Sequence, residues 1–173
     1  HIGLPGDTLP RNFPIEDFAT IPFWSSSLHQ HGVIAGGYDR DGKMTNARWN
    51  LEYNYIYDEY HLTNMALDGR SFPAFAGTSI SYYNNFIYLL GGIHNDRSYL
   101  SNVFISLDEG AHWSEITDSD NSKRPENVSG RYHTNTFVHG TNLYIIGGED
   151  NSTTYSDVYR GRMNSIGWPA IGD

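Results

Sequence analysis

A double glycine closes an apolar run three times along this chain. The runs read VIAGG, IYLLGG and LYIIGG, and the glycine pairs are Gly36-Gly37, Gly91-Gly92 and Gly147-Gly148. Successive pairs lie about 55 residues apart, and self-similarity at a fixed period of this size is typical of repeat architectures. Because glycine accepts positive φ and lets a neighbouring backbone approach closely, we expect each pair to end a strand. The sequence therefore predicts three copies of one structural unit.

Large aromatic residues follow each glycine pair at a near-constant distance. The first of them are Trp49, Phe104 and Tyr159, and the second, which we expect to mark the next strand, are Tyr57, Trp113 and Trp168. Wide aromatic surfaces are what a twisted sheet needs to bury against its neighbour. We expect these rings to fill the space between repeats.

The stretch before each glycine pair has the composition of two strands and a tight turn. We place the turns at His31-Gly32, at Asn84-Asn85 and at Gly140 near Asn142. With the two extended segments after the glycines, each repeat holds about four strands, the content of one propeller blade. The chain is predicted to be all-β.

These features resemble the kelch family of β-propellers, in which an apolar run, a glycine pair and spaced aromatics recur. The second repeat also carries Ser106, Asp108, Gly110 and Trp113 in the order S-x-D-x-G-x-x-W, which resembles an Asp-box. Such a box implies a capped hairpin turn rather than a ligand site. The segments GGYDRDGKMTNARWNLE and SDVYRGRMNSIGW further resemble uncharacterised kelch-like propeller domains of gut Bacteroidetes. That resemblance implies a periplasmic, cell-surface or secreted protein.

The repeat count leaves a ring incomplete. We assign residues 21–173 to three blades, roughly 21–70, 71–125 and 126–173, and residues 1–20 to a linker or a strand of a preceding blade. Propellers typically close with four to eight blades. We therefore expect the remaining blades from a larger parent chain of about six blades, or from a second copy.

Composition excludes several classes of partner and chemistry. The 173 residues are 38% hydrophobic, which suits one folded domain, and their net charge of -9 disfavours nucleic acid and anionic lipid. No apolar run approaches the ~18 residues of a membrane span. The absence of Cys excludes disulfides, thiolate nucleophiles and the Cys-dependent copper-radical oxidases of kelch form.

Four cationic or titratable residues are the candidate ligand-binding groups. Arg131 and His133 lie in SGRYHTNT, at the expected start of the innermost strand of the third blade, where propeller channels and pockets occur. Arg160 and Arg162 alternate along a strand, so they share a face and could clamp a carboxylate or sulfate; pairing with Asp157 is the alternative.

The sequence patterns that could indicate a metal site or a catalytic site are weaker than those for ligand binding. His29 and His31 share one strand face but have no third ligand at metal-site spacing, and Asp39–Gly42 and Asp118–Asn121 match a calcium loop only in part. A carboxylate pair of Glu52 with Asp58 or Glu59 stays open for glycoside hydrolysis, because the required separation is spatial. We expect no cofactor and no metal.

Repeat landmarks cover the sequence, whereas no catalytic motif stands out. We therefore expect a non-enzymatic binding or scaffold module whose loops and axial mouth recognise a glycan or a protein. The alternatives are a carbohydrate-active hydrolase or lyase, with its site shared with blades absent from this chain, and a structural spacer.

Overall fold

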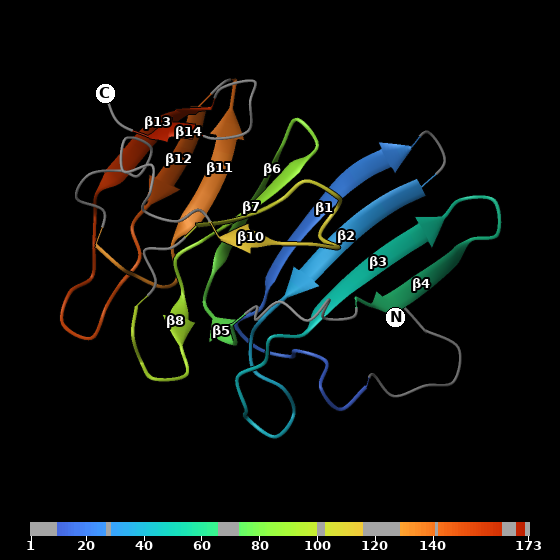
Figure 1. Cartoon of the computed structure of the whole chain (residues 1–173), viewed down its shortest axis with the longest axis horizontal. Coiled ribbons are helices and arrows are strands. Elements are labelled where there is room, and N and C mark those ends of the chain that lie inside the picture. The colour runs from blue at the N-terminus through green and yellow to red at the C-terminus, as the bar shows by residue number, and fades with distance from the viewer. Residues whose placement is uncertain are drawn as a thin grey trace.

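Three four-stranded antiparallel sheets make up the computed structural model of the chain (Figure 1). It describes residues 10–26, 29–65, 73–99, 103–115, 129–140, 142–163 and 169–171. No helix occurs within these ranges, so the described part of the chain is all-β, as expected.

Each sheet is built from strands of its own stretch of sequence, and in the second sheet the short β8 intervenes between two of them. The first sheet contains β1 (Ala19–Ser26), β2 (His29–Ala35), β3 (Arg48–Asn54) and β4 (Glu59–Asn64). The second contains β6 (Ser79–Tyr83), β7 (Phe86–Leu90), β9 (Val103–Ser106) and β10 (Ser114–Glu115). The third contains β11 (Asn135–His139), β12 (Asn142–Ile146), β13 (Val158–Met163) and β14 (Pro169–Ile171). A separate ladder joins β5 (Phe75–Ala76) to β8 (Ile93–His94).

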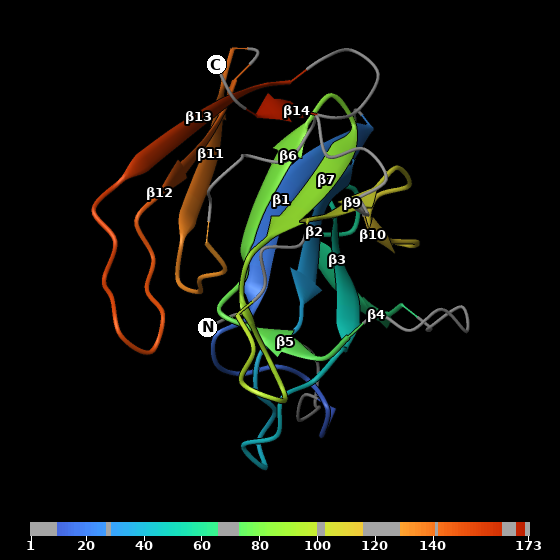
Figure 2. The same cartoon turned by 60° about the vertical axis from the view of Figure 1, so that its left-hand side comes forward.

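The three sheets fan around their first strands. β1 and β11 both contact β6, while the later strands of each sheet lie progressively farther out (Figures 1 and 2). Aligned first strands at the centre and radiating sheets are the geometry of propeller blades, and the ring is open. The first blade begins at Ala19, slightly before the expected boundary at residue 21.

Two apolar cores lie between neighbouring blades. Between the first and second sheets, Phe23 and Val33 pack with Leu89, Phe104 and Trp113. Between the second and third sheets, the buried residues are Tyr88, Leu90, Val103, Leu143 and Ile145. Every large side chain removed from water stabilises the fold by about 1.5–3 kcal/mol, so these two junctions hold the arc together.

The glycine pairs follow β2, β7 and β12, and all six glycines have positive φ. At Gly36, with φ of 66°, a Cβ atom would lie 2.3 Å from Cε2 of Phe75, which belongs to the next blade. The pair therefore marks the place where the following blade crosses over the end of the second strand.

One expected turn is wrong. β2 runs without interruption through His31 and Gly32, which pair with Phe23 and Pro22 of β1, so this pair forms no turn. Asn84 and Asn85 do form a turn, with φ of 49° and 67°, and Gly140 ends β11 with φ of 60°. A His-Gly pair is a weak turn signal because a strand also accepts glycine where another backbone approaches.

The first set of aromatics occupies equivalent register positions. Trp49 pairs with Ile34, Phe104 with Leu89, and Tyr159 with Ile145. The second set diverges. Trp113 is buried between blades, whereas Tyr57 lies in the β3–β4 turn and is 68% exposed, so its expected packing role is wrong. Trp168 lies outside the described residues.

The segment from Ser106 to Trp113 forms a closed turn between β9 and β10. The Gly110 N–H donates to Ser106 Oγ at 2.8 Å, and the His112 N–H donates to Asp108 Oδ1 at 2.8 Å. The Trp113 indole N–H donates to the Gly110 carbonyl at 2.8 Å, and its ring is buried. The polar groups of this turn are engaged with one another, which makes it a structural element.

Candidate functional site

The loops that follow the glycine pairs lie beside the segments that lead into the first strands. We call residues 14–18, 74–78 and 130–134 the lead-in segments. One antiparallel pairing joins loop and lead-in in every blade: Glu16 with Tyr38, Ala76 with Ile93, and Tyr132 with Glu149. The repeat therefore brings six variable segments to one end of the arc.

The lead-in segments meet at the centre through a chain of backbone hydrogen bonds. The Gly77 N–H donates to the Asp17 carbonyl at 2.9 Å, and the His133 N–H donates to the Gly77 carbonyl at 2.8 Å. All three residues have positive φ, of 51°, 62° and 55°. Gly accepts this conformation freely and Asp and His are enriched in it, which explains these residue types at one repeated position.

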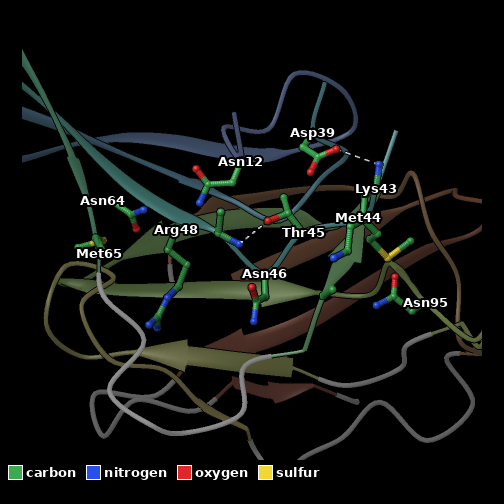
Figure 3. A pocket seen from close by; sticks show the side chains of 12 residues that line it. Asn12, Asp39, Lys43, Met44, Thr45, Asn46, Arg48, Asn64, Met65 and Asn95 are labelled. Atoms are coloured by element: carbon green, nitrogen blue, oxygen red, sulfur yellow. Dashed lines mark hydrogen bonds between the residues drawn. The ribbon is translucent and has the colours of Figure 1, made fainter. Parts of the chain in front are cut away.

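A hollow of about 720 Å³ opens beside this centre, on the first blade (Figure 3). Its polar lining includes four side-chain amides, Asn12, Asn46, Asn64 and Asn95, together with Asp39, Lys43, Thr45 and Arg48. Arg48, which is buried, extends in the same direction as Asn46, and Met44 and Met65 supply apolar wall (Figure 3). Since an amide both donates and accepts hydrogen bonds, this lining suits a neutral, hydroxyl-rich ligand.

A second hollow of about 430 Å³ adjoins the first, and Met44 and Asn95 line both. It is lined from all three blades, and its aromatic members are Tyr38, Tyr99 and Tyr132. The Tyr99 and Tyr132 rings stack with centroids 5.5 Å apart. Together the two hollows form a polar surface with aromatic faces, which we call the axial mouth.

His133 lies between two carboxylates beside the axial mouth, which its partner Asp17 and its neighbour Tyr132 line. Its Nδ1 is 3.1 Å from Glu149 Oε1, and its Nε2 is 3.4 Å from Asp17 Oδ1. The side chain is 44% exposed, so solvent and ligands can reach it. The histidine connects the first lead-in segment to the third blade. Chemically, an imidazole beside two carboxylates can also transfer protons.

Arg131 is engaged within the third blade. Its Nη1 donates to Asp157 Oδ1 at 2.6 Å and to the Gly147 carbonyl at 3.1 Å, and its guanidinium lies 3.8 Å from the Tyr155 ring centroid. This hydrogen bond from Arg131 lowers the pKa of the Asp157 carboxyl. The contacts give Arg131 a structural role, and ligand binding by it stays a prediction.

The remaining two candidates lie apart from the axial mouth. Arg160 and Arg162 pair with Tyr144 and Asn142 along β13, and Arg160 lines neither of the two hollows described above. Arg160 is exposed. The structure therefore does not gather the four predicted residues into one site, and a carboxylate clamp on β13 stays a separate prediction.

Aspartates in the loops after the glycine pairs cap turns. Asp39 Oδ1 accepts the N–H groups of Asp41 and Lys43, each at 2.9 Å. Asp150 accepts the Tyr155 hydroxyl at 2.6 Å and the Ser152 N–H at 2.7 Å, and these bonds, led by that of Tyr155, lower its pKa to about 2. Among the described residues, no group of three or more His, Asp or Glu has metal-site geometry. Asp118–Asn121 lies outside those residues.

The β3–β4 hairpin ends in a cluster of exposed tyrosines. Tyr53 lies 4.5 Å from Tyr55 and 4.7 Å from Tyr60, measured between ring centroids. The Tyr53 hydroxyl donates to Asp58 Oδ1 at 2.5 Å. This hydrogen bond, together with the negative charge of Asp58, raises the pKa of Tyr53 to about 12. Asp58 is thus engaged by Tyr53, and Glu59 pairs with His61.

Replacing Asp58 with asparagine should lower the pKa of Tyr53 towards its ordinary value of 10.0, because the charge that opposes phenolate formation is removed. The measurement is a pH titration of ¹³C-labelled tyrosine by NMR, following the phenol carbon of Tyr53. Asp39→Asn, which removes a carboxylate far from this hairpin, is the control. An unchanged titration in Asp58→Asn would contradict the assigned contact.

One family matches nearly the whole chain. Residues 5–171 match the family described as the DUF6242 beta propeller domain. The chain belongs to this family. The radial sheets of the DUF6242 propeller agree with that description, which gives a fold and no activity. No curated protein matches the chain. Within the described residues of this DUF6242 propeller, no helix could span a membrane.

The sequence indicates His133 as a ligand-binding candidate, which stays a prediction, and does not indicate its neighbours. Asp17 and Glu149 are ordinary acidic residues in the sequence, and only the lead-in pairing brings them to the histidine. A signal did exist: Asp17, Gly77 and His133 occupy the same position ahead of β1, β6 and β11, and all three are residue types that tolerate positive φ.

Proposed function

We propose that this propeller is a non-catalytic recognition domain that binds a neutral carbohydrate at its axial mouth. The observation that carries the proposal is the amide-rich hollow of about 720 Å³, bordered by the tyrosines of the second hollow. Amides hydrogen-bond sugar hydroxyls in both directions, and aromatic rings offer flat faces to the apolar side of a sugar ring. The net charge of -9 disfavours a polyanionic ligand.

The kelch-like assignment and an envelope location belong to the same proposal. The glycine pairs, the equivalent aromatics and the closed Ser106–Trp113 turn support the kelch-like and Asp-box resemblance. A periplasmic, cell-surface or secreted protein would meet free or polymeric carbohydrate, which suits a recognition domain. Fractionation of source cells with an antibody against the domain tests the location.

The binding test is a glycan array followed by calorimetry with the neutral oligosaccharides that bind. Asn95 is exposed and lines both hollows, so Asn95→Ala should weaken binding about threefold to tenfold by removing hydrogen bonds. Asn142→Ala is the matched control, because Asn142 lies at the end of β12 away from Gly147. A chain that binds none of the array, or a loss equal in both variants, would contradict the proposal.

A second candidate, a carbohydrate-active hydrolase or lyase, is favoured by the contacts of His133 with Asp17 and Glu149. If the domain is such an enzyme, the histidine accepts a proton from the reacting sugar or donates one to it, and the two carboxylates orient the imidazole ring. Incubation with polysaccharides, followed by measurement of new reducing ends or unsaturated products, distinguishes it from simple binding. Turnover that disappears in His133→Ala would establish the enzyme and overturn the non-catalytic assignment.

A further inference from the structure

The third sheet is buried on one side only. Its residues alternate along β11 and β12: Val138, Leu143 and Ile145 face the second sheet, whereas Phe137 and Ile146 face away and are 46% and 37% exposed. In the second sheet, β7 is buried on both faces. The outer face of the third sheet is therefore an apolar surface that lacks a neighbour within the described chain.

Equivalent positions show what such a face normally contacts. Ile146 ends β12, and the residues that end β7 and β2, Leu90 and Ala35, are only 4% and 0% exposed. Val158 begins β13 and is 59% exposed, whereas Val103, which begins β9, is 4% exposed. In the first two sheets these positions are covered by the following blade. The third sheet thus presents the surface that receives a following blade.

The other end of the arc presents the complementary surface. Ile15, Phe75 and Arg131 occupy one position in the three lead-in segments, and their exposures are 51%, 1% and 2%. Phe75 is covered because it lies over Gly36 of the preceding blade, and Arg131 because its side chain lies beside Gly148 and pairs with Asp157 in its own blade, whereas the described part of the chain leaves Ile15 half exposed. The first sheet also carries an apolar cluster of Ile34, Trp49 and Phe13. Its Ile34 and Trp49 match Leu89 and Phe104, which pack on the first sheet. Trp49 is already buried against Phe13, so the half-buried Ile34 is the member of this pair left to contact a neighbour.

Backbone groups at the two ends match as well. The Gly37 N–H donates to the Phe75 carbonyl at 2.7 Å, and the Gly92 N–H donates to the Arg131 carbonyl at 2.8 Å. Within the described residues, the corresponding Gly148 N–H has no backbone acceptor, and the central chain of hydrogen bonds ends at the His133 carbonyl. If a first sheet followed the third sheet, its Ile15 carbonyl would accept a hydrogen bond from the Gly148 N–H. Its Asp17 N–H would donate to the His133 carbonyl.

The space over Gly147, the first glycine of the last pair, is open, whereas Gly148 is crowded by its own lead-in segment. A Cβ atom on Gly36 would collide with the Phe75 ring at 2.3 Å, whereas one on Gly147 would meet only the Tyr155 carbonyl, at 3.3 Å. The place that Phe75 fills in the first junction is therefore vacant in the third blade. In the first junction this place holds Phe75, whose equivalent in the first lead-in segment is Ile15.

From these complementary ends we propose that the third sheet of one chain receives the first sheet of a second copy. Ile15 of that copy packs over Gly147, and its half-buried Ile34 faces Ile146 and Val158. Because the same junction forms twice, two chains close a twofold ring within the four to eight blades typical of propellers. This pairing is independent of the carbohydrate proposal.

The test is sedimentation velocity and light scattering over a dilution series. We expect a particle of twice the chain mass of 19.6 kDa that dissociates on dilution. Val158→Asp and Ile15→Asp should each weaken the dimer at least about tenfold, because each places a charge in both junctions. Both side chains are exposed in a single chain, so the melting temperature of the diluted monomer should stay unchanged. Ile56→Asp is the control, since Ile56 is 63% exposed in the β3–β4 turn.

Mixing the two variants tests the head-to-tail geometry. A Val158→Asp chain keeps an intact first sheet and an Ile15→Asp chain keeps an intact third sheet, so the mixture regains one unaltered junction and should dimerise more than either variant alone. Monomers at every concentration would overturn the proposal and would mean that blades of another polypeptide cover the outer face of the third sheet. Dimers that persist in Val158→Asp, dimers equally weakened by Ile56→Asp, or no gain on mixing would overturn it too.

Discussion

Replacing Gly92 with valine should destabilise the domain by about 3 kcal/mol or more, since strain and collision act together at this position. Gly92 has φ of 104°, and a Cβ atom there would lie 2.9 Å from the Ala76 carbonyl and 2.5 Å from Thr78 Oγ1. Its N–H also joins the second blade to the third through the Arg131 carbonyl. The expected result is a lower midpoint in urea unfolding, monitored by tryptophan fluorescence.

Gly42→Val is the matched control for this variant. Gly42 has φ of 70°, but nothing lies within 4 Å of a Cβ atom built on it. The Gly42→Val variant should therefore lose only ~1–2 kcal/mol of unfolding free energy, which is the cost of a residue with a side chain in the left-handed conformation. The difference between the two variants isolates the contact with the second lead-in segment. Equal losses would show that no backbone crosses closely over Gly92.

The repeat landmarks predict the architecture because they are tied to local geometry. A glycine pair is needed wherever the next blade crosses the end of a second strand, as at Gly36 beneath Phe75. Trp49, Phe104 and Tyr159 recur because each occupies the same register position in its blade. Such features repeat with the fold, so one sequence with three copies is enough to find them.

Positions that differ between repeats are harder to predict. The His31-Gly32 pair resembles a turn, yet β2 continues through it, since glycine in a strand is as permissible as glycine in a turn. Tyr57 keeps the aromatic spacing but lies on an exposed hairpin. Spacing along the chain indicates which strand holds a residue and does not determine whether the next blade covers it.

The axial mouth could be predicted only in part, for a physical reason. His133 was identifiable from its position ahead of the third blade, but its partners come from a loop and from a lead-in segment in the first blade. The amides of the larger hollow likewise come from segments as distant as Asn12, Asn46 and Asn95. These amides carry no periodic signal, whereas Asp17 and His133 share one repeat position with Gly77.

Replacing Arg131 with methionine should destabilise the domain by about 3 kcal/mol, the lower end of the range for breaking a buried ion pair. The arginine side chain is 3% exposed, and removing it leaves the Asp157 carboxylate, 37% exposed, without its 2.6 Å partner. It also removes the bond to the Gly147 carbonyl and the contact with the Tyr155 ring. Arg40→Met, at an exposed turn position, is the control and should change stability by about 0.5 kcal/mol or less.

The pH dependence separates the ion pair from simple packing. Arg131 holds the pKa of Asp157 below 3.8, so the pair contributes stability that is present above that pH and is lost as the pH falls through the folded-state value. The difference in unfolding free energy between wild type and Arg131→Met should therefore be largest near neutral pH and should narrow below about pH 4. Urea unfolding of both proteins at a series of pH values measures this difference in unfolding free energy. A difference that stays constant down to the acid limit would mean that the methionine variant loses packing alone, and that the Asp157 carboxylate gains nothing from the guanidinium beside it.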